Sequence, residues 1–171
     1  MLPFQVMRLR NAGFATVLNW TPTTNSTGWS GFTFRQRINA SRLIASTQAR
    51  LTIDTTGFPL NMSKVYIGQE AVGGGYDFDT TPVQVLWSGS PSIATAGGVF
   101  VSDITAFSQN ATRNLIISAF FNSTTTLRRT PSVPSEKYGF IAGDQANVVD
   151  WSGFSESATE QLNLVTKIEL R

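Results

Sequence analysis

Neither cysteine nor histidine occurs among the 171 residues. Without cysteine the chain forms no disulfide and offers no thiolate ligand to a metal. Without histidine it lacks the commonest general base at neutral pH and the commonest nitrogen ligand for metals. A Ser-His-Asp triad is therefore impossible, and we expect a protein that is not an enzyme and that uses no cofactor.

The sequence also lacks a long apolar run near its start. The segment MLPFQVMRLRNAG carries isolated apolar residues and two arginines, which fits neither a signal peptide nor a transmembrane span. We therefore expect a chain that is made in the cytoplasm and not inserted into a membrane. Its length predicts one domain that buries close to ~70% of the surface exposed by the unfolded chain.

Acidic residues are absent from residues 1–53, which hold six arginines, whereas the rest of the chain holds all eleven acids. A subunit polarised in this way can pack against neighbouring copies. The candidate interface residues are Arg8, Arg10, Arg35 and Arg37. The alternative is that these arginines are scattered over solvated strand faces. The net charge is only +2 and no nucleic-acid motif is present, so we expect no nucleic-acid partner.

Hydrophobic residues alternate with polar ones along most of the chain, which predicts half-buried strands. The clearest examples are FTFRQRI, QARLTID and QLNLVTKIEL. Further candidates are FQVMRLR, FATVLNW, KVYIG, VQVLW, VFVSDITAF, NLIISAFF and KYGFIA. Segments such as TPTTNSTGWSG and TTTLRRTPSVP, rich in Thr, Ser, Pro and Gly, are expected to be loops.

About ten short strands in one domain predict an all-β fold, an antiparallel β-sandwich of the jelly-roll type. NASRLIAS is the one helical candidate, at most two turns long. We assign residues 32–171 to the sandwich. Residues 1–31 form either an N-terminal arm or the first strands of the same sandwich.

Trp-Ser-Gly occurs three times, at Trp29, Trp87 and Trp151. Aromatic rings at strand ends can form a flat platform on which a sugar stacks. Together with Tyr76, these tryptophans are the candidate residues for a glycan site. The alternative is that they close the ends of the hydrophobic core.

The stretch GGGYDFD, residues 73–79, combines three glycines with two acids. It lacks the Gly-Lys-Ser/Thr of a phosphate-binding loop, so it is expected to be a turn. Asp77 and Asp79 share a side of an extended chain and could, with Glu70, supply oxygen ligands to calcium. Because no EF-hand pattern is present, these acids are weak candidates, and solvated or turn-capping carboxylates are the favoured interpretation.

The sequence contains, in this order, the segments FRQRI-NASRL, ARLTI, SKVYIGQEA, YDFDTTPVQVLWSG, AGGVFVSDITAF, NLIISAFF and KIEL. This succession resembles a β-sandwich module of bacteriophage and prophage virion proteins. Similar modules are found beside SGNH/GDSL-type esterase domains. The likeness covers residues 32–171. It implies that Phe78, Val83, Val85 and Trp87 lie in the core or at its ends, and that catalytic residues belong to other domains.

The resemblance implies a non-catalytic virion structural protein, either a capsid decoration subunit or a component of the tail or fibre tip. Its expected partners are other copies of itself and other virion proteins, and its expected location is the virion. The alternative function is a carbohydrate-binding module or adhesin that recognises host surface glycans.

Overall fold

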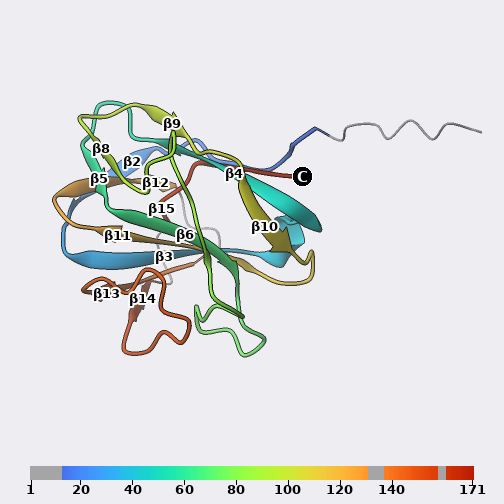
Figure 1. Ribbon diagram of the computed structural model, residues 1–171. Coiled ribbons are helices and arrows are strands. Elements are labelled where there is room, and N and C mark those ends of the chain that lie inside the picture. Colours follow the sequence, from blue (N-terminus) through green and yellow to red (C-terminus); the bar gives the residue numbers. More distant parts are fainter. Residues whose placement is uncertain (1–12, 131–136, 158–160) are drawn as a thin grey trace, which may run out of the picture.

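Short antiparallel strands make up most of the computed structural model, which describes residues 13–130, 137–157 and 161–171 (Figure 1). The described residues contain sixteen strands and one 3₁₀ helix, η1 (Ala40–Arg42). The chain is therefore all-β, as predicted, and the short helical candidate shrinks to a single turn. The strands outnumber the expected ten because several polar segments also pair.

Two sheets form the sandwich. The upper sheet has the order β1 (Ala15–Asn19), β16 (Lys167–Leu170), β4 (Ser46–Asp54) and β10 (Thr105–Gln109), and β9 (Val99–Val101) also pairs with β4. The lower sheet has the order β14 (Ser155–Ser157), β13 (Tyr138–Ala142), β3 (Phe32–Ile38), β11 (Leu115–Phe121), β6 (Lys64–Gln69) and β7 (Val83–Gln84).

Eight of these strands have the order of a jelly roll. In chain order they are β1, β3, β4, β6, β7, β10, β11 and β16. The first, eighth, third and sixth form the upper sheet, and the second, seventh, fourth and fifth lie side by side in the lower sheet. Because consecutive strands mostly alternate between the sheets, both sheets contribute to one core.

Two smaller groups of strands lie toward the end of the sandwich shown at the left of Figure 1. One is a sheet of β2 (Thr24–Trp29), β12 (Thr125–Thr130) and β15 (Gln161–Asn163), and the other pairs β5 (Leu60–Met62) with β8 (Ile93–Thr95). Residues 15–29 thus supply strands β1 and β2 to the fold, whereas residues 1–12 lie outside the described part.

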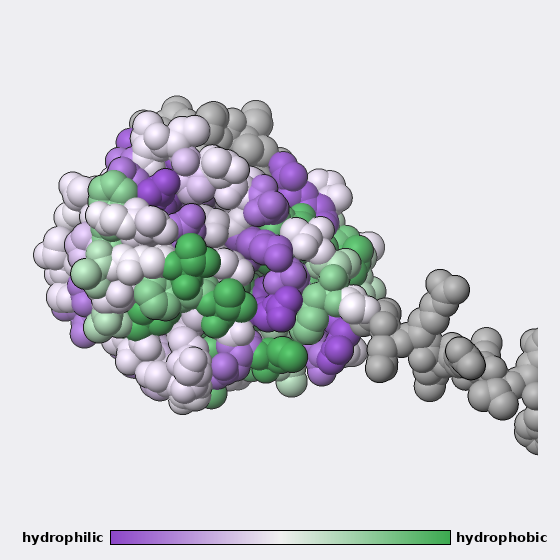
Figure 2. All heavy atoms as spheres, turned by 90° about the horizontal axis from the view of Figure 1, so that it is seen from above, coloured by the Kyte–Doolittle hydropathy of each residue, from purple (hydrophilic) through white to green (hydrophobic). Residues whose placement is uncertain are grey.

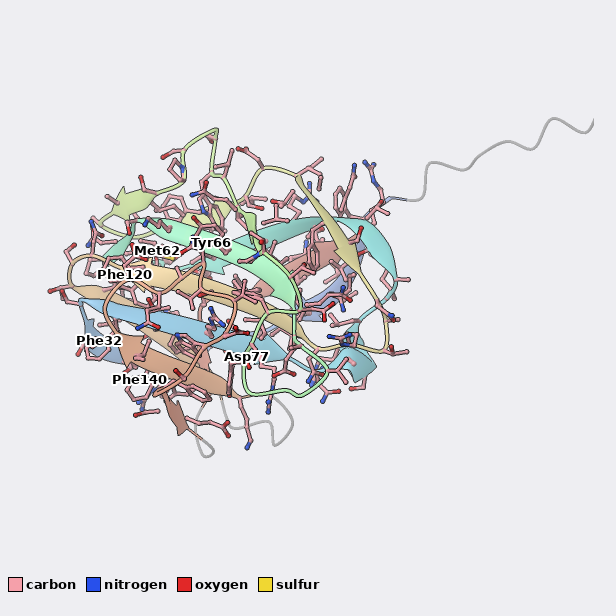
Figure 3. The ribbon with its side chains drawn as sticks, turned by 60° about the horizontal axis from the view of Figure 1, so that its bottom comes forward. Phe32, Met62, Tyr66, Asp77, Phe120 and Phe140 are labelled. Carbon is pink, nitrogen blue, oxygen red and sulfur yellow. The ribbon has the colours of Figure 1, made fainter. Side chains whose placement is uncertain are left out.

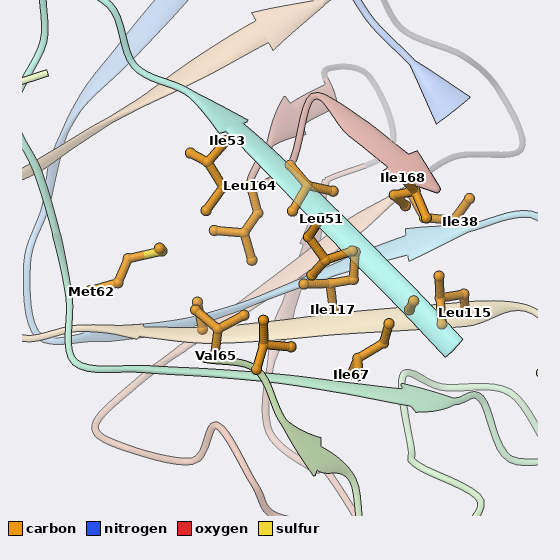
Figure 4. Close-up of a cluster of buried hydrophobic side chains, with 14 of the residues drawn as sticks. Ile38, Leu51, Ile53, Met62, Val65, Ile67, Leu115, Ile117, Leu164 and Ile168 are labelled. Carbon is orange, nitrogen blue, oxygen red and sulfur yellow. The ribbon is translucent and has the colours of Figure 1, made fainter. Parts of the chain in front are cut away.

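The core fills the space between the sheets (Figure 4). Leu51 and Ile53 of β4 belong to the same buried cluster as Ile117 of β11 and Ile67 of β6, and all four are at most 2% exposed. Alternation along each strand puts these side chains on the inner face. Burial of such side chains contributes about 1.5–3 kcal/mol each.

The segment QLNLVTKIEL is not one strand, contrary to prediction. It divides into β15 and β16, which belong to different sheets, and the residues between them are buried. The side-chain oxygen of the buried Gln36 accepts hydrogen bonds from the amides of Leu164 (2.8 Å) and Val165 (3.0 Å). Those bonds satisfy the backbone where the chain crosses between sheets, a contact that the period-two pattern does not reveal.

Loops cover the outer face of the lower sheet. Tyr76 and Phe78 from one loop pack with Trp151 from another and with Ile116 of β11 in a second buried cluster. Figure 3 shows the loop that carries Asp77 crossing this side of the sheet. Both faces of β3 are consequently buried, whereas the sequence predicted one polar face.

Candidate interaction surface

The four candidate sugar-binding aromatics do not form a common platform. Tyr76 (0% exposed) and Trp151 (3%) contact each other in the loop layer, with ring centroids 6.1 Å apart. Trp87 belongs to the main core. Trp29 is partly buried and packs edge-to-face on Phe140 at 5.3 Å. The alternative that these rings close the core therefore describes them better, and the predicted glycan platform is wrong.

Arg35 is likewise not an interface residue, because its side chain is fully buried. Its guanidinium lies 4.2 Å from the centre of the Phe78 ring and 4.6 Å from that of Trp151. It donates hydrogen bonds to the carbonyl oxygens of Tyr76 (2.5 Å) and Val148. Arg35 thus holds both covering loops on the sheet, a role that the sequence did not reveal.

Burial lowers the pKa of Arg35 to about 9, although the nearby negative charge of Asp77 acts in the opposite direction. The guanidinium still carries its charge at neutral pH. Asp77 itself accepts a hydrogen bond from the backbone amide of Trp151 at 2.6 Å. The carboxylate and the guanidinium therefore join the same two loops.

Arg37 shares the outer face of β3 with Arg35, as predicted, but lies at the rim of the loop layer. Its guanidinium pairs with Glu70 at 3.4 Å. Arg50, another cation of the basic N-terminal third, pairs with Glu169 at 2.9 Å. These arginines thus meet acids from later in the chain, which weakens the case for a basic interface. Arg8 and Arg10 lie outside the described residues.

The calcium candidates bind other protein groups. Glu70 accepts hydrogen bonds from Asn114 (2.6 Å) and from the amide of Tyr76 (3.2 Å), and Asp79 pairs with Arg113 at 3.1 Å. In the part of the chain that the structure describes, no group of three acidic side chains is placed to hold a metal ion. Glu70 and Arg113 also line a polar pocket of about 500 Å³, together with Arg37.

The outer face of the upper sheet differs from that of the lower sheet, because exposed apolar side chains lie on it. Val99 (60% exposed) and Val101 (51%) project from β9, and Ile104 (53%) follows just before β10. Figure 2 looks down on this side and shows hydrophobic surface next to a hydrophilic band. The sequence predicted VFVSDITAF as one strand, which the structure divides into β9 and β10, and it did not identify this surface.

Charged groups lie on the other part of the same face. Glu169 accepts hydrogen bonds from Arg50 and from Lys167, both at 2.9 Å, and these bonds lower the pKa of its carboxyl group. Arg50 and Arg171 also stack on the ring of Phe14, at 4.8 and 5.0 Å from its centre. The face therefore combines an apolar strip with a set of ion pairs.

A groove of about 410 Å³ lies beside the apolar strip. Its lining includes Trp87, Ser88 and Ile93 on one side and the three residues of β9 on the other. Phe100 is half-buried between its two exposed neighbours. The site thus combines exposed apolar side chains on a sheet face with a groove along a strand at the edge of that sheet.

No family model matches the sequence, and no curated protein matches it. Within the described residues, no helix is both long and apolar enough to cross a membrane. The interpretation of the candidate surface therefore depends on its chemistry and on the topology of the fold.

Proposed function

We propose that the chain is a non-catalytic structural protein of a bacteriophage virion, either a capsid decoration subunit or a component of the tail or fibre tip. It acts by contact with further copies of itself and with other virion proteins. The observation that carries this proposal is the apolar strip of Val99, Val101 and Ile104, whose side chains are 51–60% exposed on one sheet face.

The topology supports the same proposal. Jelly rolls occur widely in viral capsid proteins and in lectins. The sequence resemblance described above also points to virion modules. Fold alone does not determine function, so the surface chemistry has to decide between these classes.

The contrast between the two sheet faces favours a contact role over sugar binding. Aromatic residues that could stack on a sugar are used to cover the lower sheet or to fill the core. Exposed aliphatic side chains, in contrast, suit a protein–protein contact, where apolar area is removed from water. Recognition of a host glycan stays a prediction without an aromatic platform to support it.

Immunogold labelling of phage particles with an antiserum against the purified protein tests the proposal. Particles produced from a genome that encodes this chain should bind the antiserum at a regular position, whereas particles from a deletion strain should not. Absence of the protein from intact purified particles, as measured by labelling and by mass spectrometry, would contradict a virion role.

A further inference from the structure

Among the described residues, strand β9 pairs along one edge only, with β4, and its other edge is free. The carbonyl of Gly98 accepts a hydrogen bond from Thr55 of the loop after β4, and the amide of Ser102 donates one to Leu51, both at 2.8 Å. Backbone groups of successive residues in an antiparallel strand point to opposite sides. Val99 and Val101 therefore turn their N–H and C=O groups away from β4, toward the groove.

The free edge exists because the neighbouring chain turns away. The amide of Asp103 still donates to the carbonyl of Leu86 at 2.9 Å, so pairing begins on this side. The chain then reverses direction between Trp87 and Ser90, which form a tight pair through two backbone hydrogen bonds. The reversal leaves the groove in the place that a continuing strand would occupy.

This edge has little protection against pairing beyond the shortness of β9, which is three residues long. Edge strands are commonly shielded by lysine, proline, a bulge or a covering segment. Between Gly98 and Ser102 the sequence is Val-Phe-Val, with no charged residue and no proline. The two valines are exposed on either side of the half-buried Phe100. The edge therefore offers main-chain hydrogen bonds and apolar contacts together.

We propose that residues 1–12 of a second copy of this chain bind along β9 as an added strand. This inference deepens the proposed function and rests on it for the choice of a second copy as the donor. A groove between β9 and the Trp87–Ser90 turn suits a single extended segment better than the edge of another folded domain. Strand addition of this kind gains affinity from the backbone and specificity from alternate side chains.

The sequence of the donor segment fits the groove. In an extended chain Phe4, Val6 and Arg8 share one face, so that apolar side chains and a cation meet the acceptor together. On the acceptor, Asp54 pairs opposite Val99, and Asp103 lies two residues after β9, where its carboxylate also accepts hydrogen bonds from the amides of Ser88 (3.1 Å) and Gly89 (2.7 Å). Residues 1–12 contain no acid, so their charge is complementary to these two carboxylates.

Hydrogen exchange of the full-length protein tests the proposal. The amides of Val99 and Val101 should exchange about tenfold more slowly at high protein concentration than at low concentration, because strand addition gives them acceptors. An excess of a synthetic peptide with the sequence of residues 1–12 should maintain this protection at low protein concentration. Protection that does not depend on concentration would overturn the proposal, because the segment would then bind its own chain.

Two lysine variants provide a matched control. Val101→Lys places a charge at the acceptor edge, and Val72→Lys places one at a more exposed valine (86% against 51%) in a loop over the lower sheet. Circular dichroism should show both variants folded. The first should lose the concentration-dependent protection, whereas the second should keep it. Equal behaviour of the two variants would overturn the proposed acceptor site, while particle labelling would still test the virion role independently.

Discussion

At the scale of single residues, the most informative side chain is Arg35. Alternation along β3 correctly placed Arg35 and Arg37 on one face, and a solvated or interface role followed from that placement. The structure buries Arg35 between two aromatic rings from loops that are distant in sequence. A sequence pattern identifies the face of a strand, but it does not show what packs on that face.

Replacement of Arg35 by methionine should destabilise the protein by about 2–4 kcal/mol, because the carbonyls of Tyr76 and Val148 lose a buried donor and Asp77 loses its nearby cation. Arg37→Met, two residues away, should cost less than Arg35→Met, since its ion pair with Glu70 is long and Glu70 keeps its hydrogen bonds from Asn114 and from the amide of Tyr76. Urea unfolding measures both changes. Equal losses would contradict the clamping role of Arg35.

Glu169 should make stability depend on pH. The pKa of its carboxyl group is lowered in the folded state, mainly by the hydrogen bond from Arg50. The stabilisation is therefore complete above the unfolded-state pKa and is lost as the pH falls through the folded-state value. At neutral pH, Glu169→Gln should lower the free energy of unfolding by about 1 kcal/mol. In unfolding experiments between neutral and acidic pH, this difference should shrink toward zero, and a constant difference would contradict the assignment.

At the scale of elements, two glycines explain how aromatic rings approach the lower sheet closely. Gly68 of β6 and Gly139 of β13 lie beneath the loop layer, in strands on either side of the β3–β11 pair. A Cβ atom at Gly68 would lie 2.4 Å from the Phe78 ring, and one at Gly139 would lie 2.8 Å from the Trp151 ring. Glycine within a strand often marks such a close approach.

Gly68→Ala should therefore destabilise the protein by about 1–3 kcal/mol, because Phe78 has to move away from the sheet. Gly73→Ala is the matched control, since a Cβ atom there meets nothing within 4 Å. Its effect should stay within about 0.5 kcal/mol. Thermal or urea unfolding compares the two variants. A Gly68→Ala protein as stable as the control would show that Phe78 does not depend on this approach.

Strands with alternating apolar residues could be predicted from the sequence, and most polar strands could not. The segments FTFRQRI and NLIISAFF correspond to β3 and β11 almost residue for residue. In contrast, β2 and β12 consist mainly of Thr, Asn, Ser and Arg and were expected to be loops. Their partners are each other and β15, so tertiary pairing overrides their low apolar content.

The candidate site was predicted less well, for a related physical reason. The local sequence around a tyrosine or tryptophan at a strand end is the same whether the ring faces a ligand or a covering loop. Val83 was expected in the core or at its ends, but it is 38% exposed on β7, an edge strand of the lower sheet. An unprotected strand edge depends on where the neighbouring chain turns, which the local sequence does not specify.

At the scale of the whole molecule, the two sheets have different surroundings. The chain covers the outer face of the lower sheet with its own loops and leaves apolar side chains exposed on the upper one. Such exposure is unfavourable for an isolated subunit and is typical of a surface that contacts a partner. Assembly through the upper sheet is therefore the central claim.

The most direct test is the molar mass of the full-length protein in solution, measured by light scattering over a range of concentrations. The account predicts a mass greater than that of one 18.6 kDa chain, which falls toward that value on dilution and in Val101→Lys. A strictly monomeric protein at every concentration would contradict self-assembly through this face.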